Sequence, residues 1–137
     1  MIETERIDVP TLKPEIKIDN EARDKLLNQM QEEAQVIVHC SFTGRMQNDK
    51  IRVWKSTYLY TKDSSHKSEL ILAENITMYP TWMYINKGQT INFTLIFSGL
   101  PKHCKHFDLI ENIPEPGGFA FLNIERNNSD VYSLEII

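Results

Sequence analysis

The chain has 137 residues, 41% apolar and 25% charged, a composition that suits one globular domain with a buried core. Its formal net charge is −4, and the excess acid lies in residues 1–33, which hold nine acidic and five basic side chains. Residues 34–137 hold ten of each sign and therefore lack the basic stripe that nucleic-acid binding requires.

Residues 1–19 predict an extended arm, because Pro10 and Pro14 stand among alternating charges. The opening has acidic residues where a secretory signal would have a basic and then an apolar region. No stretch of the chain reaches membrane-spanning length. We therefore expect a cytoplasmic protein that has neither a membrane nor a nucleic acid as its partner.

Residues 20–33 predict one amphipathic helix. Asn20 can cap the first turn, and the apolar side chains that follow recur at helical spacing: Ala22, Leu26, Leu27 and Met30. The apolar stripe is narrow and the other faces are charged. We expect this helix to lie across one edge or end of a sheet.

From residue 34 the apolar period changes to two, which is typical of half-buried strands. The clearest case is Thr90–Ser98, where Ile91, Phe93, Leu95 and Phe97 share one face. Gly99-Leu100-Pro101 ends that run. Further strands are predicted at 34–42, 51–60, around Leu70 to Ile76, 82–85 and 106–111.

Residues 119–125 and 131–136 are predicted to pair as a final hairpin across the turn at 126–130. The whole pattern gives seven or eight short strands with no interleaved helix. It predicts an all-β, mainly antiparallel fold, an immunoglobulin-like β-sandwich over residues 34–137 with the N-terminal helix appended. The three segments 1–19, 20–33 and 34–137 make a single domain overall.

His103, Cys104 and His106 are candidate metal ligands or members of a thiol-dependent active site, with His39 and Cys40 as further donors. Residues 39 and 40 point to opposite faces of one strand, and the donor spacing matches no structural zinc pattern. The other interpretation is a buried cysteine in a polar strand entry. The nearby carboxylates Asp108, Glu111 and Glu115 are expected to be solvated edge charges.

The aromatic side chains are the most plausible interaction feature, because tyrosine and tryptophan supply contact area at low entropic cost. The candidate protein-binding residues are Tyr58, Tyr60, Tyr79, Trp82 and Tyr84. In the alternative interpretation, Trp54 and Trp82 fill the ends of the core. A pocket near these two tryptophans would instead make the chain a carrier of small apolar ligands.

Cys40, Trp54 and Cys104 follow the order and approximate separation of the disulfide and tryptophan of immunoglobulin domains. Lys102 stands where those domains have a tyrosine, and a cytosolic chain keeps its thiols reduced. Two interpretations stay open for the cysteines, a disulfide or two small apolar fillers.

Residues 90–101, TINFTLIFSGLP, followed by FDLIE at 107–111, resemble a segment of uncharacterised bacterial immunoglobulin-like β-sandwich domains. The resemblance implies a sandwich fold, an accessory or interaction role, and no catalytic residues or cofactor. Together with the residue patterns, it predicts a non-enzymatic module that binds a protein partner or a second copy of itself.

Overall fold

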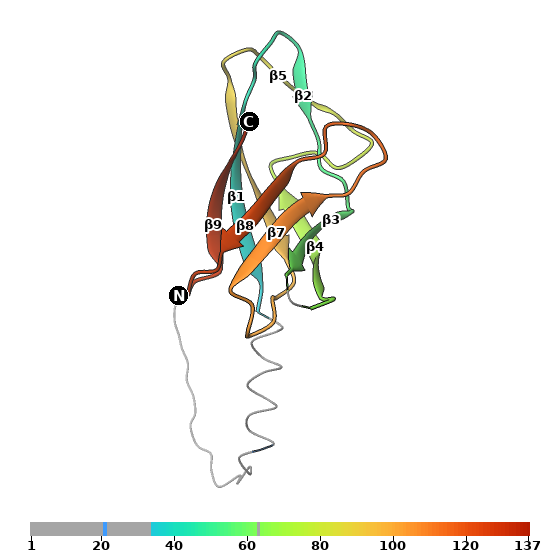
Figure 1. Ribbon diagram of the computed structural model, residues 1–137. Coiled ribbons are helices and arrows are strands. Elements are labelled where there is room, and N and C mark those ends of the chain that lie inside the picture. Colours follow the sequence, from blue (N-terminus) through green and yellow to red (C-terminus); the bar gives the residue numbers. More distant parts are fainter. Residues whose placement is uncertain (1–20, 22–33, 63) are drawn as a thin grey trace, which may run out of the picture.

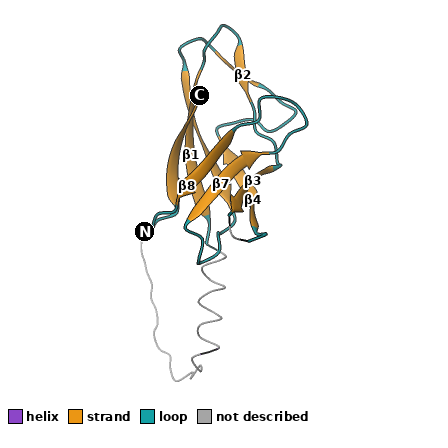
Figure 2. Cartoon of the chain, viewed as in Figure 1, coloured by secondary structure: helices purple, strands orange, loops and turns teal. Residues whose placement is uncertain are grey.

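The computed structural model describes Glu21, residues 34–62 and residues 64–137. The predicted arm at 1–19 and all of the predicted helix at 20–33 except Glu21 lie outside the described residues. Residues 34–62 and 64–137 form nine β-strands and no helix (Figures 1 and 2). The described part of the chain is therefore all-β, as predicted, with more strands than the seven or eight expected.

Seven strands form one sheet in the order β8-β7-β3-β4-β6-β1-β9, and β2 and β5 form a separate two-stranded ribbon. All paired strands are antiparallel except β1 and β9, which are parallel. The strand bounds are Val36–Thr43 (β1), Asp49–Ile51 (β2), Thr57–Thr61 (β3), Lys67–Glu74 (β4), Met83–Ile85 (β5), Thr90–Phe97 (β6), His106–Glu111 (β7), Ala120–Glu125 (β8) and Val131–Ile136 (β9).

The seven-stranded sheet curls around one core (Figure 1). Alternate residues of β1, β3, β6 and β7 are fully buried on its inner face, including Leu59, Phe93 and Leu109. Phe107 of β7 and Tyr132 of β9 meet edge to face, with ring centroids 5.1 Å apart. Because β7 and β9 lie toward opposite ends of the strand order, this contact requires the sheet to bend back on itself.

The strand predicted at 51–60 is wrong as a single element. The chain leaves β2 after Ile51 and turns between Trp54 and Thr57, where the amide and the hydroxyl of Thr57 both donate to the Trp54 carbonyl, at 3.2 and 2.7 Å. The Trp54 amide in turn donates to the carboxylate of Glu111, at 3.0 Å. The Glu111 carboxylate accepts this hydrogen bond in place of a carbonyl from a neighbouring strand, so the backbone can bend at Trp54.

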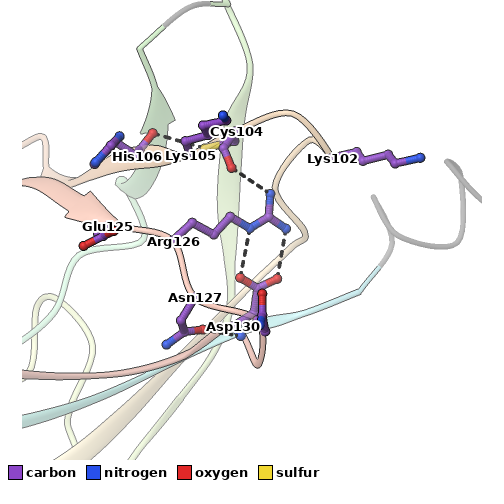
Figure 3. A pocket seen from close by; sticks show the side chains of 9 residues that line it. Lys102, Cys104, Lys105, His106, Glu125, Arg126, Asn127 and Asp130 are labelled. Atoms are coloured by element: carbon purple, nitrogen blue, oxygen red, sulfur yellow. Dashed lines mark hydrogen bonds and ion pairs between the residues drawn. The ribbon is translucent and has the colours of Figure 1, made fainter.

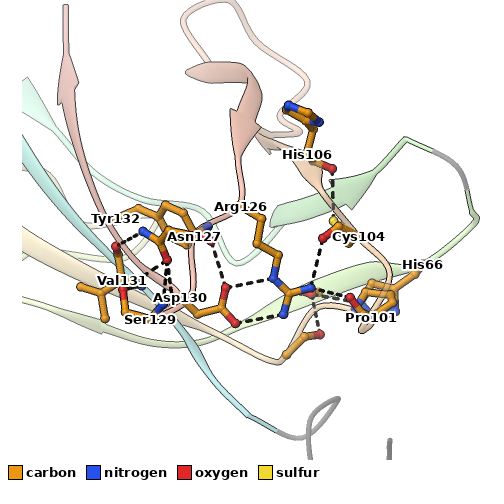
Figure 4. Close-up of polar contacts among 12 residues, drawn as sticks. His66, Pro101, Cys104, His106, Arg126, Asn127, Ser129, Asp130, Val131 and Tyr132 are labelled. Carbon is orange, nitrogen blue, oxygen red and sulfur yellow. Dashed lines mark hydrogen bonds and ion pairs between the residues drawn. The ribbon is translucent and has the colours of Figure 1, made fainter.

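The predicted final hairpin is also wrong, although both of its strands exist. β8 pairs with β7 and β9 pairs with β1, so the two strands lie at opposite ends of the strand order. Asn127 shapes the connection at 126–130, because its side-chain oxygen accepts the amides of Ser129 and Asp130 at 3.1 and 2.7 Å (Figure 4). The amide of Ile37 then donates to the Asp130 carbonyl at 2.9 Å, which directs the chain onto β1.

Arg126 holds this crossing in place (Figure 4). Its guanidinium makes two hydrogen bonds to the carboxylate of Asp130, at 3.0 and 3.1 Å, and also donates to the carbonyls of Pro101 and Cys104. Only 10% of the Arg126 side chain and 16% of the Asp130 side chain are exposed. The pair therefore joins the 101–104 loop to the connection between β8 and β9.

We expect Arg126→Met to lower the free energy of unfolding by about 3 kcal/mol, because it leaves the largely buried Asp130 carboxylate with the Tyr132 hydroxyl but without its cation, and two carbonyls without the guanidinium donor. Urea unfolding followed by circular dichroism measures this loss. Arg45→Met is the matched control: Arg45 is 61% exposed and lies 3.8 Å from Asp49, so its loss should cost at most about 1 kcal/mol. Equal losses in the two variants would contradict a special role for Arg126.

Candidate functional site

Two cationic side chains and three aromatic rings gather beside the ribbon of β2 and β5, and we call them the cation–aromatic cluster: Lys50, Arg52, Trp54, Tyr79 and Trp82. The guanidinium carbon of Arg52 lies 3.7 Å from the ring centroid of Trp82 and 4.6 Å from that of Tyr79. The Lys50 ammonium lies 4.3 Å from the Trp82 centroid, and Trp54 stacks on Tyr79 at 3.7 Å. These distances are within the range of cation–π attraction and aromatic stacking.

The ribbon register brings these residues together. Lys50 pairs with Tyr84 and Ile51 with Met83, and after β2 a single parallel bridge joins Val53 to Met78. The ribbon stays close to the end of β1 because Gly44 has no side chain: a Cβ there would lie 2.3 Å from the Asn86 carbonyl oxygen. Two sequence segments thus run side by side, with the cations on one and most of the aromatic rings on the other.

Arg52 is fixed on both sides of its guanidinium. One nitrogen donates to the Pro80 carbonyl at 2.9 Å, and the other pairs with Glu115 at 3.1 Å. Its Nε is buried and makes no hydrogen bond to any described residue. Because the planar group also lies over Trp82, Arg52 holds the indole ring in a defined position.

A groove of about 430 Å³ lies next to the cluster. The ribbon side contributes Lys50, Arg52, Trp54 and Trp82, and the opposite wall comes from the loop between β7 and β8 and from the end of β9. The apolar lining consists of Phe42, Ile51, Ile113, Phe119, Ile136 and Ile137. Both tryptophans of the chain line this groove, so indole fluorescence reports on this site alone.

Glu111 lines the groove and is buried, contrary to the expectation of a solvated edge charge. Burial raises the pKa of its carboxyl group. Backbone hydrogen bonds from Trp54 and Phe119 and the charge of Arg52 act in the opposite direction but are smaller. Glu111 thus ties the Trp54 turn to the β7–β8 loop, and this structural role explains why the sequence carries an acid there.

The structure divides the five predicted protein-binding residues into two groups. Tyr79, Trp82 and Tyr84 lie on or beside the ribbon, where Tyr84 is 65% exposed and Trp82 is half-buried. Tyr58 and Tyr60 lie on β3 of the large sheet, where their rings meet at 6.0 Å and Lys67 covers Tyr58 at 4.2 Å. Neither tryptophan belongs to the fully buried core, so they do not fill its ends.

Lys50 and Arg52 are the members of the site that sequence reasoning missed. In the sequence they are two of several scattered basic residues in a charge-balanced body. The sequence shows only that the two residues alternate along one segment and so share a face. Whether that face meets aromatic side chains depends on which segment pairs with it. Only the β2–β5 register identifies the aromatic segment as that partner.

Of the candidate metal or thiol site, Cys104 and His106 line a second pocket of about 390 Å³, whereas His103 does not (Figure 3). His103 and His106 are exposed, while Cys104 is buried with its sulfur 3.1 Å from the His106 carbonyl. Lys102 points away from the other side chains in Figure 3, and His106 is directed away from Arg126. Among residues 21, 34–62 and 64–137, no three histidine, cysteine or acidic side chains are grouped to hold a metal ion.

His39 and Cys40 point to opposite faces of β1, as predicted. His39 is exposed and its Nδ1 lies 2.9 Å from the Thr94 hydroxyl, whereas Cys40 faces the core. Burial raises the pKa of the Cys40 thiol to about 12, so this sulfur stays protonated and unreactive. Cys40 and Cys104 form no disulfide and both lie within the core, which agrees with the interpretation of two small buried fillers.

No family model, curated protein or solved structure matches this chain. None of the described residues belongs to a helix long and apolar enough to cross a membrane. The cation–aromatic cluster and its groove are therefore the features of the described chain that bear on its function.

We predict a pH-dependent stability difference between the native chain and Glu111→Gln. The pKa of Glu111 is raised on folding, so its contribution to stability is present below the pKa of an unfolded glutamate and is lost as the pH rises through the folded value. Glutamine keeps a hydrogen-bond acceptor but does not titrate. Urea unfolding at a series of pH values should therefore show the native chain losing stability relative to Glu111→Gln as the pH rises from 4 toward neutral. The exposed Glu125→Gln is the control, and the same trend in both variants would contradict the assignment.

Proposed function

We propose that this chain is a non-enzymatic interaction module that binds another polypeptide at the cation–aromatic cluster and the adjoining groove. The observation that carries this proposal is Trp82, whose ring is in contact with the cations of both Lys50 and Arg52, with Tyr79 and Tyr84 exposed beside it. Tryptophan, tyrosine and arginine dominate the energetics of protein interfaces. Side chains that are already fixed lose little entropy when a partner binds.

The groove lining indicates the chemistry of the partner. Arg45, Lys50 and Arg52 lie on one side, and Glu115 already neutralises Arg52. Arg45 lies 3.8 Å from Asp49, so Lys50 remains to attract an acidic group, while the apolar lining can accept a hydrophobic side chain. We therefore propose a polypeptide segment that combines an apolar or aromatic residue with a nearby carboxylate. The partner is a different protein or a second copy of this chain.

The proposal includes the finer fold assignment, an immunoglobulin-like sandwich. In that assignment β4, β6, β1 and β9 form one layer, and β3, β7 and β8 form the other. The inward-facing Cys40 and Cys104 and the resemblance of residues 90–111 to bacterial domains of this type support it. Cys40 and Cys104 form no disulfide, which supports a cytoplasmic location, where cysteines stay reduced.

A displayed library of random peptides, selected on the full chain, tests the binding proposal. We expect selected peptides to bind at least about 30-fold more weakly to the double variant Lys50→Ala/Tyr84→Ala, because the loss of a hot spot costs about 2 kcal/mol or more. Isothermal titration calorimetry measures the affinities. Tyr58→Ala/Tyr60→Ala removes the half-buried tyrosines of the other group and should bind as the native chain does.

Peptides that bind both double variants equally well would contradict the proposal. So would a selection that yields no binder while sedimentation velocity shows only monomer over the accessible concentration range. Self-association that disappears in Lys50→Ala/Tyr84→Ala would instead identify a second copy as the partner.

A second candidate function is a carrier of small apolar ligands, favoured by the volume of the groove and by its two tryptophans. Ligand sites commonly enclose about 300 to 1,000 Å³. A metal- or thiol-dependent enzyme at His103, Cys104 and His106 has no comparable support, since these side chains do not converge in the described structure.

For the carrier, we expect a saturable change in tryptophan fluorescence when an apolar compound enters the groove. A panel of fatty acids, sterols and aromatic compounds is titrated into the full chain, and Phe119→Asp serves as the variant that should abolish any response. A panel that leaves the fluorescence unchanged would contradict the carrier function. It would leave the polypeptide-binding proposal intact, because the peptide selection tests that separately.

A further inference from the structure

Strand β9 pairs with a described strand along one of its edges only. It ends the strand order beside β1, and in Figure 1 it lies at the left margin of the described fold. The amide of Ile37 in β1 donates to the Asp130 carbonyl at 2.9 Å. In a parallel ladder, alternate residues turn their backbone groups toward the neighbouring strand, so the even-numbered residues of β9 bond to β1. The residues whose amides and carbonyls face away from β1 are Val131, Ser133 and Glu135.

These three outward-facing residues differ in their hydrogen bonds. The Val131 amide donates to the Ser129 hydroxyl at 3.4 Å, and the Val131 carbonyl accepts from the side-chain amide of Asn127 at 2.9 Å. The backbone groups of Ser133 and Glu135 make no hydrogen bond to any described residue. Their amides and carbonyls therefore lie open along the edge. An extended backbone offers donors and acceptors at this alternating spacing.

The strand at the other end of the sheet is less suited to such pairing. The register of β8 against β7 shifts between Phe107 and Leu109, and Asn123 in β8 has a φ of 59°. A bulge of this kind bends an edge strand and interrupts its row of backbone groups. In contrast, β9 pairs with β1 without a register shift and contains no proline or lysine. Of the two end strands, β9 is therefore the one that can accept another strand.

A second copy of the chain fits this edge in one register. When two β9 strands run antiparallel about a two-fold axis at Leu134, Ser133 of each copy lies opposite Glu135 of the other. Both pairs are then of the hydrogen-bonded type, and all the open groups of both copies find a partner. A register centred on Glu135 would instead set two carboxylates directly opposite each other. A register centred on Ser133 would set Glu135 opposite Val131, whose backbone groups are already bonded.

The side chains agree with the register centred on Leu134. This half-buried leucine meets Leu134 of the second copy on the inner face, in the closely spaced type of pair. On the outer face Val131 and Ile137, which are 38% and 95% exposed, lie opposite each other. Residues 34–137 hold ten acidic and ten basic side chains, so the two bodies carry no net charge that would keep them apart.

We propose that two copies of this chain associate through β9, in antiparallel pairing with Ser133 opposite Glu135. The seven-stranded sheet then continues from one copy into the other. This edge is a different surface from the cation–aromatic cluster, and the proposal does not depend on polypeptide binding there. One strand edge from each copy is a small contact, so we expect a reversible dimer with a dissociation constant of the order of 10 µM.

Charge substitutions at Ser133 test both the dimer and its register. Ser133 is exposed, so a change there leaves the fold of the single chain intact. Sedimentation velocity of the full chain measures the dissociation constant. We expect Ser133→Lys to lower it about fivefold and Ser133→Glu to raise it about fivefold, because each dimer gains two opposite-charge or two like-charge pairs. Ser133→Glu/Glu135→Lys should restore dimerisation, since each pair again joins opposite charges.

Asn92→Lys and Asn92→Glu are the matched controls. Asn92 is exposed on β6 of the same face, and its variants change the net charge by the same amounts, so the dissociation constant should stay as in the native chain. A protein that remains monomeric up to about 1 mM would overturn the proposal. A dimer that responds equally to charge at Ser133 and at Asn92 would do the same.

One further outcome separates this proposal from binding at the cation–aromatic cluster. Self-association that is lost in Lys50→Ala/Tyr84→Ala but is unaffected by charge at Ser133 would overturn pairing through β9 and place the contact at the cluster. Weaker peptide binding by Lys50→Ala/Tyr84→Ala, with dimerisation unchanged, is the result expected when both proposals hold.

Discussion

The crossing from β8 to β9 is the constraint on which the rest of the structure depends. A two-strand hairpin would have placed β9 beside β8, yet the chain passes from one end of the sheet to the other within five residues. The ion pair of Arg126 with Asp130 and the backbone bond from Ile37 fix that passage. Parallel pairing of β9 with β1 follows, because β9 starts at the same end of the sheet as β1.

The curl of the sheet also creates the groove. Since β8 and β9 are the end strands of the described sheet, they do not pair, and apart from Tyr132 their inward residues are only partly buried. Ile136 at the end of β9 and Phe119 before β8 face the same space as Phe42 at the end of β1. The groove is therefore a consequence of the topology, and the β2–β5 ribbon adds the charged and aromatic wall.

Much of the fold was predictable because its information is local. The alternation at 90–98 and at 106–111 fixes both the strands and their buried faces, and the structure places β6 and β7 there. The break within 51–60 was not predictable, because its cause is the carboxylate of Glu111, 57 residues from Trp54 along the chain. The prediction of a final hairpin was wrong for a related reason. Strand alternation specifies which side chains face the core, but it does not specify which strand becomes the neighbour.

The site was predictable in part for the same physical reason. The presence of tyrosines near residues 79–84 can be read from the sequence. The contacts of Lys50 and Arg52 with the Trp82 ring depend on the strand register that pairs Lys50 with Tyr84. Arg52 lies over the Trp82 ring because Pro80 and Glu115, from two further segments, accept hydrogen bonds from its guanidinium. A lysine could not satisfy both partners and cover the indole ring, because its ammonium is a point charge without a planar face. The position therefore requires arginine for its shape, and a binding surface built on Trp82 depends on that one side chain.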